Sequence, residues 1–397
     1  MSTQYKTHPA IIGLDFGTDG IKVTLSTAQG VCPIRLGEKN QSIFPAALSL
    51  NENDKLLHGN VAKRRVCVDP EHSIYALKLL LGLRWDDLYA HHVRQHLQYS
   101  LIPSPPNNIN VKLKSQAVTI FDLAAFLLSK VRERVEEQAG HSIDEVVMTC
   151  PVNYQEAQCL ALYNLGRAAG FRYVELLHEA KAAALAYGFG QRCARTIAVC
   201  DWGTGTFDCS ILRSNESASF DILGWESVLL LGDNIEDKVI RNILVMLRQH
   251  NQVSAIEDGW SMQRIVAAAE KVRHRLSTHL STEINLPFFS PEDRNDAFHI
   301  QMFLSQSQLK QWLQDTLETV DQACRQACDK AGIDPQDIDD LILVGGHTCL
   351  PLVHAHASEL FGREPCVGMD PRLTIALGAG LQGVSRLDEV RASHQCA

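Results

Sequence analysis

Residues 198–210 read AVCDWGTGTFDCS, where an apolar run ends in an acid and a glycine-rich turn follows. An earlier stretch repeats this arrangement. IIGLDFGTDGIKVTL at 11–25 and IAVCDWGTGTFDCSI at 197–211 share an apolar run, an aspartate, an aromatic residue, Gly-Thr and a second run. Asp15 and Asp201 lie 186 residues apart. The repeat predicts a duplicated fold of two α/β halves, each opening with a hairpin that carries an acid at its tip.

Glycine-rich hairpins of this kind suit a polyphosphate ligand. Their successive backbone N–H groups point outward and form a concave site for anions. Two opposed acids would then hold a hydrated divalent metal, and Mg²⁺ is favoured because it prefers hard oxygen ligands and keeps several waters. One such turn alone is common in hairpins that bind nothing, so the prediction depends on the two copies occurring in matching contexts.

Composition narrows the class of protein. The chain has 397 residues, of which 45% are hydrophobic and 21% charged, which suits a globular protein with a large core. A net charge of -9 argues against a nucleic-acid partner. The N-terminal MSTQYKTHPA has no apolar core of signal-peptide length, and no run approaches the roughly 18 apolar residues of a membrane span. We expect a soluble cytoplasmic protein with no membrane partner.

The twelve cysteines are scattered and contain no CxxC pair, so reduced thiols are expected rather than a disulfide framework. Cys324 and Cys328, like His92 and His96, have the i, i+4 spacing of two ligands on one helical face. Neither pair is accompanied by two further ligands at zinc-like spacing. The sequence therefore predicts no metal site at either pair.

Several stretches, taken in order, resemble the nucleotide-binding domain of the 70-kDa heat-shock (DnaK-type) chaperones, within the actin-like ATPase superfamily. The two hairpins carry the superfamily resemblance. The chaperone branch is indicated by four further stretches: SIYALKLLLGLRWDD at 73–87, EVVMTCPVNYQEAQCLALYNLGRAAGF at 145–171, LLHEAKAAALAYG at 176–188 and LILVGGHTCLPLVHAHASELFG at 341–362. The resemblance runs from about residue 11 to 384 and implies an α/β fold of two duplicated lobes around a nucleotide cleft, with ATP or ADP and Mg²⁺ as cofactors.

The resemblance also implies a role for each matching position. Lys78 matches a lysine that positions or activates the attacking water and offsets charge on the γ-phosphate. Thr18 and Thr206 match hydroxyls that face the terminal phosphates. The implied catalytic set is Lys78, Asp15, Asp201, Asp208, Thr206 and Glu179, with Mg²⁺ held by Asp15, Asp201 and Glu179 largely through water. The implied phosphate loops are Gly17, Thr18, Asp19 and Gly203, Thr204, Gly205. Such a site acts mainly by positioning and by stabilising charge.

The base end of the nucleotide is expected on the second half. RIVAAAEKVRHRLST at 264–278 resembles the family's adenosine helix, which implies Glu270, Arg273, His274 and Ser277 near ribose and adenine. Gly345 and Gly346 follow the LILV strand, where a Cβ would hinder a close approach of the backbone, and Arg372 is expected on the same side. From the residues alone, a plain amphipathic helix and a plain strand-end turn would be the favoured explanation, and it is the order of all the motifs along the chain that supports the resemblance.

The departures from the family pattern predict weaker or altered nucleotide binding. Asp19 stands where the family usually has threonine, and Thr204 replaces a usual glycine. His274 and Cys349 stand where arginines commonly sandwich adenine, which removes guanidinium stacking. Arg372 stands where an acid is usual.

A second group of departures concerns the relay to the family's peptide-binding domain. Ala180 replaces a proline and Cys159 an arginine, and after TIALGAGLQGV the chain continues only as SRLDEVRASHQCA. That domain is therefore expected to be absent. The expected organisation is lobe I at 1–194, lobe II at 195–371 with a helical subdomain at 234–320, and a crossover helix with a short polar tail at 372–397.

Three functions remain open from the sequence. The first is a slowly hydrolysing chaperone-type ATPase that acts in protein folding or chaperone regulation, which we favour because the phosphate, metal and lysine positions are filled. The second is a non-catalytic, nucleotide-sensing module that binds chaperones, co-chaperones or exchange factors. The third is a kinase for a small substrate, and the chaperone-type motifs argue against it.

Overall fold

The computed structural model describes residues 10–36, 41–189, 194–215, 219–251, 259–289 and 298–395. Residues 1–9, which include most of the N-terminal stretch considered above, and the last two residues of the predicted polar tail lie outside this part of the chain. Among the helices that are described, none combines the length and the apolar character needed to cross a membrane.

The first sheet is built around the N-terminal hairpin. Its strand order is β12-β11-β1-β2-β3, with β4 paired to β2. The strands are β1 (Ile11–Phe16), β2 (Gly20–Thr27), β3 (Gly30–Ile34), β4 (Ile43–Pro45), β11 (Glu145–Cys150) and β12 (Tyr173–His178). β11 runs parallel to both β1 and β12, and the pairs with β2 are antiparallel. β1 is buried along its whole length, which explains why it reads as a continuous apolar run.

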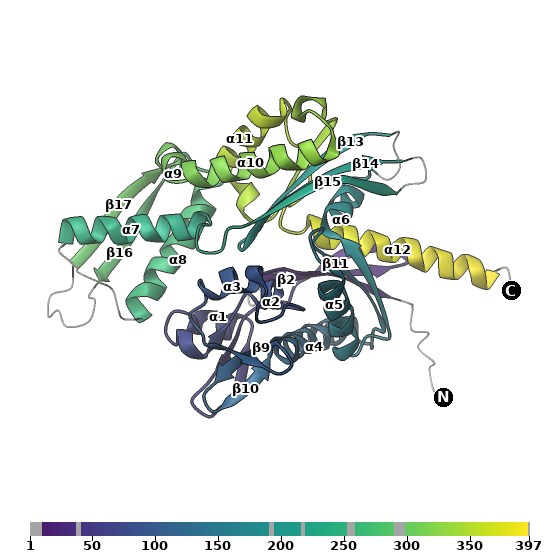
Figure 1. The fold of residues 1–397 in the computed structure, drawn as a ribbon, viewed down its shortest axis with the longest axis horizontal. Coiled ribbons are helices and arrows are strands. Elements are labelled where there is room, and N and C mark those ends of the chain that lie inside the picture. The colour runs from purple at the N-terminus through teal and green to yellow at the C-terminus, as the bar shows by residue number, and fades with distance from the viewer. Residues whose placement is uncertain are drawn as a thin grey trace.

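The second sheet repeats the central part of the first. Its order is β15-β14-β13-β18, from β13 (Thr196–Trp202), β14 (Thr206–Ser214), β15 (Phe220–Leu229) and β18 (Asp340–Val344). β13 and β14 form an antiparallel hairpin, and β18 runs parallel to β13 as β11 does to β1. The repeated hairpins thus occupy equivalent places in two mixed sheets (Figure 1).

Helices cover both sheets. The first sheet packs against α4 (Ile120–Ala139), α5 (Glu156–Ala168) and α12 (Thr374–Gln395), and the second against α10 (Gln314–Ala331), α11 (Pro351–Phe361) and α6 (Glu179–Ala186). α12 lies on β1, β2 and β3 and also contacts α6 (Figure 1). Thr24 donates a hydrogen bond to the Ala376 carbonyl at 2.8 Å, and Ser26 to the Gly380 carbonyl at 2.6 Å. The C-terminal helix is therefore fastened to the first sheet.

The segment expected to be a helical subdomain also contains strands. Its elements are α7 (Ile235–Asn251), α8 (Gly259–Leu276), β16 (Ser281–Phe289), β17 (Phe298–Ser305) and α9 (Gln306–Trp312). β16 and β17 pair as an antiparallel hairpin against α8. Ile284 and Leu286 are buried while Glu283 and Asn285 are exposed, and this alternation is the two-residue period of a half-buried strand. This hairpin within 234–320 was not singled out from the sequence.

Smaller elements lie beside the first sheet. They are two three-stranded sheets, from β5 (Leu48–Leu50), β6 (Leu56–His58) and β7 (Ser73–Ile74) and from β8 (Leu101–Ser104), β9 (Asn108–Leu113) and β10 (Gln116–Thr119), with α1 (Asn60–Arg65), α2 (Leu77–Leu80) and α3 (Leu88–Arg94). α2 contacts α3 and α4. Leu77, Leu79 and Leu80 of this short helix are buried, which fixes the direction of the intervening Lys78.

Candidate functional site

Two equivalent residue pairs form the centre of the candidate site, one in each hairpin. In β1–β2, Asp15 lies opposite Lys22, and in β13–β14, Asp201 lies opposite Asp208. Both pairs are seven residues apart in the sequence, so the repeat places a lysine in the first hairpin where the second has an aspartate. Asp15 is only 4% exposed.

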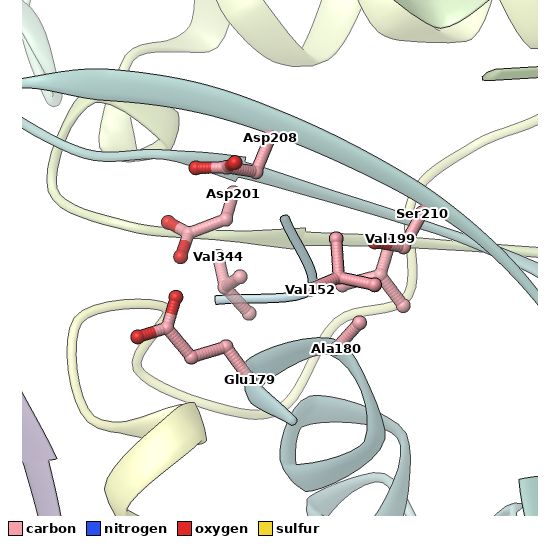
Figure 2. Close-up of a pocket in the computed structure, with 8 residues that line it drawn as sticks. All are labelled: Val152, Glu179, Ala180, Val199, Asp201, Asp208, Ser210 and Val344. Atoms are coloured by element: carbon pink, nitrogen blue, oxygen red, sulfur yellow. The ribbon is translucent and has the colours of Figure 1, made fainter. Parts of the chain in front are cut away.

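Three carboxylates line one pocket between α6 and the second sheet. Asp201 and Asp208 come from the hairpin and Glu179 from the first turn of α6, and their carboxylates point toward the same side of the pocket (Figure 2). The remaining lining residues are Val152, Ala180, Val199, Ser210 and Val344. Burial raises the pKa of Asp201 well above its usual range, and the charges of Glu179, Asp208 and Asp15 raise it further. Burial likewise raises the pKa of Asp208.

Lys78 of α2 reaches this acid pocket through Glu179. Its Nζ lies 2.6 Å from Oε1 of Glu179, and both side chains are largely buried. Burial acts to lower the pKa of Lys78, but the charges of Glu179 and Asp15 outweigh it and the pKa is raised. The pKa of Glu179 is also raised, because burial and the neighbouring acids outweigh the ammonium. Tyr154 donates a hydrogen bond to the Lys78 carbonyl at 2.9 Å and so holds the backbone of α2.

Lys22 is a site residue that the sequence reading missed. Its Nζ lies 2.9 Å from Oδ2 of Asp15, and a methyl group at Gly17 would lie 2.9 Å from the same ammonium. The charges of Asp15 and Asp201 raise the pKa of Lys22 against the effect of burial. The signal was present in the sequence, since the seven-residue spacing that predicts Asp208 opposite Asp201 also places Lys22 opposite Asp15.

The two predicted phosphate loops lie against each other. A methyl group at Gly205 would lie 2.9 Å from Cγ2 of Thr18, so the second loop passes close to the first. The Thr206 hydroxyl donates a hydrogen bond to Oδ2 of Asp208 at 2.8 Å. In the same turn, the Gly203 amide donates to the Thr206 carbonyl at 3.0 Å. The structure thus brings together the loop residues from both copies of the repeat.

The unusual residues of these loops have their own partners. Asp19, about half exposed, pairs with Lys63 at 3.4 Å, and Lys63 also pairs with Glu270 of α8 at 2.9 Å. The negative charge of the Asp19 carboxylate is therefore paired with the ammonium group of Lys63. The Thr204 carbonyl accepts a hydrogen bond at 2.9 Å from the side chain of Asn234. Lys63 and Asn234 were not singled out from the sequence, because only the tertiary structure brings them to the loops.

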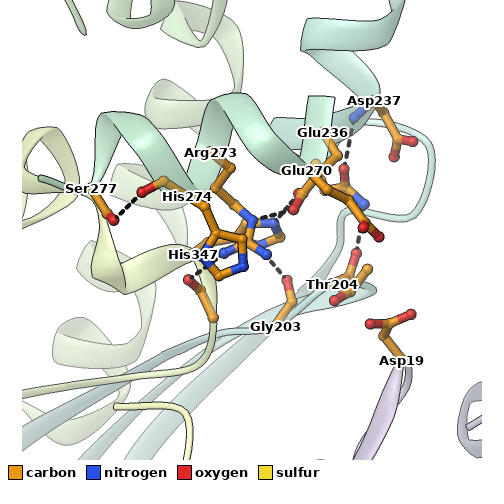
Figure 3. A network of polar contacts seen from close by, with 12 residues as sticks. Asp19, Gly203, Thr204, Glu236, Asp237, Glu270, Arg273, His274, Ser277 and His347 are labelled. Carbon is orange, nitrogen blue, oxygen red and sulfur yellow. Dashed lines mark hydrogen bonds and ion pairs between the residues drawn. The ribbon is translucent and has the colours of Figure 1, made fainter. Parts of the chain in front are cut away.

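An ion-pair network occupies the expected adenosine side (Figure 3). Arg273 pairs with Glu236, and Glu236 also pairs with the ring Nε2 of His347. The other ring nitrogen, Nδ1, faces the Gly203 carbonyl at 3.0 Å. Both ring nitrogens of His347 therefore face hydrogen-bond acceptors. Burial acts to raise the pKa of Glu236, but His347 and Arg273 outweigh it and hold the pKa well below its usual range.

The remaining residues of the expected adenosine side gather near this network. Ser277 donates a hydrogen bond to the His274 carbonyl at 2.6 Å. Burial lowers the pKa of His274, and the charges of Arg273 and Arg372 lower it further. Arg372 is held by Asp370 at 2.7 Å. Burial raises the pKa of Cys349, although the neighbouring Arg372 acts in the opposite direction.

The two glycines after β18 differ in their surroundings. Gly345 has a φ of +94°, and a Cβ there would lie 2.4 Å from the Trp202 carbonyl and 2.6 Å from Oδ1 of Asp201. Apart from Gly346 itself and its two chain neighbours, no described residue has an atom within 4 Å of the position that a Cβ on Gly346 would take. Gly345 is therefore required by packing within the protein, whereas Gly346 leaves open space. The Gly346 carbonyl accepts a hydrogen bond from Arg273 at 3.4 Å.

The acid pocket has the donor chemistry that suits Mg²⁺. Oδ1 of Asp208 is buried and receives no hydrogen bond from any residue that the structure describes. Four carboxylates (Asp15, Asp201, Asp208 and Glu179) meet there with two ammonium groups (Lys22 and Lys78). If all are ionised, two negative charges remain, which a hard divalent cation would neutralise. Because Lys22 already pairs with Asp15, the carboxylates with the least compensation are Asp201 and Asp208.

The two positions expected to have lost their relay function also have defined places. Ala180 lines the acid pocket next to Glu179. Cys159 lies in α5, where its Sγ is 3.9 Å from the Tyr154 carbonyl. The Tyr154 hydroxyl in turn donates a hydrogen bond to the Lys78 carbonyl. Tyr154 therefore links Cys159 of α5 to Lys78, whose ammonium pairs with Glu179 of the acid pocket.

A comparison with known protein families gives one match that covers nearly the whole chain. A family model described as "Hsp70 protein" matches residues 11–390. The matched region contains both hairpins, Lys78, the acid pocket and the network around Glu236.

Proposed function

Because the chain belongs to the Hsp70 family, we propose that its paired hairpins bind ATP or ADP with Mg²⁺ and that it hydrolyses ATP slowly. Membership confirms the predicted resemblance and, with the two mixed sheets, the actin-like ATPase fold. Domains of this family bind ATP or ADP with Mg²⁺ in general, and its members act as chaperone ATPases. The observation that carries the proposal is the meeting of Lys78, Glu179, Asp201 and Asp208 beside the two glycine-rich loops.

In this proposal the protein residues act mainly by position and charge. The loop amides around Gly17 and Gly203, with the hydroxyls of Thr18 and Thr206, would cradle the phosphates. Lys78, fixed by Glu179, would place its ammonium beside the transferring phosphoryl group and orient the attacking water. Lys22 would add a second fixed cation next to the first loop.

Asp201, Asp208 and Glu179 would hold Mg²⁺ largely through water, with Asp15 close by. When bound, the ion would screen the charge on the phosphates and the acids. The ion-pair network of Glu236, Arg273 and His347 would line the part of the site that holds ribose and adenine. The other residues proposed to line this part are Glu270, His274, Ser277, Gly346 and Arg372. We also propose the division into lobe I at 1–194, lobe II at 195–371 and a crossover helix at 372–397.

A calorimetric titration with ATP, with and without Mg²⁺, followed by a turnover assay, tests this function. We expect chelation of the metal to weaken ATP binding by at least tenfold, about 1.4 kcal/mol, with slow release of phosphate in the presence of Mg²⁺. Equal affinity with and without Mg²⁺ would remove the metal from the proposal. Hydrolysis that requires an added sugar would point to a small-substrate kinase.

The second candidate is a nucleotide-sensing module that binds protein partners without hydrolysis. Two observations favour this module. Arg273 forms an ion pair with Glu236, and positions 274 and 349 hold a histidine and a cysteine. These features leave no arginine pair to sandwich adenine. Binding of ATP with Mg²⁺ but without turnover in the same experiment would support the module over the ATPase.

We place the docking site for a protein partner on the segment from 234 to 320. Members of the family generally interact with co-chaperones and exchange factors. Among its described residues, this segment exposes four large apolar side chains, and the three most exposed are Trp260 (69%), Leu280 (80%) and Phe303 (67%). Scattered apolar residues are common on surfaces, but those that anchor an interface are large and often aromatic.

Binding of a family exchange factor, measured by surface plasmon resonance, tests this docking site. Leu280→Ser and Phe303→Ser should each weaken binding by about tenfold, the loss expected for a moderate interface contact. Leu88→Ser is the matched control, because Leu88 is 70% exposed on α3, outside the segment. Equal weakening by all three variants would argue against a site on this segment.

A further inference from the structure

Three cysteine thiols meet in the core behind the second sheet. Cys200 comes from β13, Cys209 from β14 and Cys324 from α10, and their Sγ atoms all lie within 4.8 Å of one another. Their residues are 3%, 0% and 2% exposed. We infer that this thiol cluster is a binding site for a soft metal ion, with Cu(I) as the preferred ion.

The spacing of one sulfur pair, that of Cys200 and Cys209, matches the spacing of metal-bound thiolates. Metal–sulfur bonds of about 2.3 Å place two sulfurs about 4.0 Å apart in trigonal geometry and about 3.8 Å apart in tetrahedral geometry. The Sγ atoms of Cys200 and Cys209 are 3.9 Å apart. A disulfide would require about 2.05 Å, so the two strands hold this pair at coordination distance rather than bonding distance.

The cluster is rigidly supported. Cys200 and Cys209 lie directly opposite each other in the β13–β14 hairpin, and α10 packs against β14. Strand register and helix packing therefore set the positions of all three ligand residues. A site built on strands and a helix holds its geometry better than one on loops.

The number of thiols favours Cu(I) over Zn²⁺. Soft thiolate ligands select Cu(I), Zn²⁺ or iron–sulfur clusters. Structural Zn²⁺ sites are almost always four-coordinate, whereas three thiolates complete a trigonal Cu(I) site. Within the described residues, no fourth His, Cys, Asp or Glu joins the group at that distance. Cys328, one turn along α10, is buried but is not part of it.

A pocket connects the cluster with partly exposed groups. Cys200 and Cys324 line it together with Asp321 and His356. The last two form a 2.7 Å pair, with side chains 31% and 19% exposed. The imidazole of His356 and the carboxylate of Asp321, which are partly exposed, would bind an entering ion before it reaches the thiols. Each thiol that binds releases its proton to solvent, so a fully bound Cu(I) displaces three protons.

The cluster and the acid pocket lie on opposite faces of one hairpin. Cys200 precedes Asp201 and Cys209 follows Asp208, and successive side chains in a strand point to opposite faces. In agreement, Asp201 and Asp208 line the acid pocket while Cys200 and Phe207 line the pocket behind the sheet. A metal ion bound by the thiols would therefore hold together the parts of β13 and β14 that carry Asp201 and Asp208.

Anaerobic competition with the Cu(I) chelator bicinchoninate tests the proposal on the whole chain. The wild type should withdraw one equivalent of Cu(I) from the chelator and should bind Zn²⁺ far more weakly. Cys209→Val and Cys324→Ala should each lower Cu(I) affinity by more than about a hundredfold, since loss of only an outer-shell partner already costs 10–100-fold. Cys328→Ala and Cys32→Ser are the controls and should retain wild-type affinity, because one thiol is buried outside the cluster and the other is exposed.

Circular dichroism and thermal unfolding of each apo variant separate loss of ligand from loss of fold. A folded Cys324→Ala chain that still binds Cu(I) like the wild type would overturn the proposal. So would a wild type that takes no Cu(I) from the chelator, or an equal loss of affinity in Cys328→Ala. Binding in the wild type with selective loss in Cys209→Val and Cys324→Ala would support it.

Discussion

The ammonium of Lys22 lies 2.9 Å from the carboxylate of Asp15, at the register position that Asp208 occupies opposite Asp201 in the second hairpin. The duplicated hairpins are therefore not electrostatically equivalent. The first contributes an acid with its own cation, and the second contributes two acids that lie opposite each other. This asymmetry directs a divalent cation toward Asp201 and Asp208, and it makes Lys22 part of the charge balance of the site.

Removing the Lys22 ammonium should show how much it contributes to the charge balance of the site. Lys22→Met leaves the buried Asp15 carboxylate without its partner and should lower the free energy of unfolding by about 3 kcal/mol, the scale for breaking a buried pair. Adding Mg²⁺ should stabilise this variant more than the wild type, because a divalent cation then takes the place of the ammonium. Chemical denaturation with and without chelator measures both effects.

The double variant Asp15→Asn/Lys22→Met completes the comparison. Its loss should be smaller than the sum of the single losses by at least about 1 kcal/mol, since the two residues interact directly. Lys112→Met, on an exposed position of β9, should change neither stability nor its response to Mg²⁺. Strictly additive losses would mean that the Lys22–Asp15 contact contributes nothing.

Lys78 should affect the chemical step more than binding. Lys78→Ala should lower the rate of ATP hydrolysis about a hundredfold, the scale of one lost electrostatic or acid–base contributor. The dissociation constant for ATP should change much less. Single-turnover hydrolysis and calorimetry on the same folded sample measure the two quantities, with Lys112→Ala as control. An unchanged rate would remove Lys78 from the catalytic set.

Gly345 and Gly346 should respond oppositely to a methyl group. Gly345→Ala should destabilise the protein by more than about 1 kcal/mol, because alanine is strained at a φ of +94° and its Cβ would meet the Trp202 carbonyl. Gly346→Ala should leave stability nearly unchanged, since its φ is -68° and its Cβ would enter open space. Its ATP affinity should fall if nucleotide approaches there. Thermal unfolding and calorimetry distinguish the effects, and equal destabilisation by both variants would contradict the assignment.

Glu236 should make stability depend on pH on the acid side. Its pKa is held below its usual range in the folded protein, so its ionised form stabilises the fold above the unfolded pKa near 4.5, and this stabilisation is lost as the pH falls. The difference in unfolding free energy between wild type and Glu236→Gln should be constant from about pH 6 to 5.5. Below the unfolded value it should shrink by about 1.4 kcal/mol per pH unit. Denaturation series at matched pH values measure it, and a difference independent of pH would contradict the network.

Local pattern determined the fold class and the identity of the central acids. The repeat of Asp15 and Asp201 predicted paired hairpins because a tight turn and its flanking strands are encoded within about fifteen neighbouring residues. The order of the motifs predicted the family, and the match over 11–390 confirms it. Even the Lys22–Asp15 contact was accessible from the sequence, because strand register follows from the length of the turn. The roles of Lys78 and of the adenosine-side residues remain predictions.

Only the tertiary structure decided which separate elements meet. Lys63 links Asp19 of the first loop to Glu270 of α8, and Glu236 of α7 joins Arg273 of α8 to His347. The thiol cluster is the clearest case, because Cys324 lies more than a hundred residues from Cys200 and Cys209. The sequence shows which face of each segment is polar and which is apolar. Which side chain of another segment contacts that face depends on how the sheets and helices pack. Contacts between distant elements are fixed by that packing, and no local spacing encodes them.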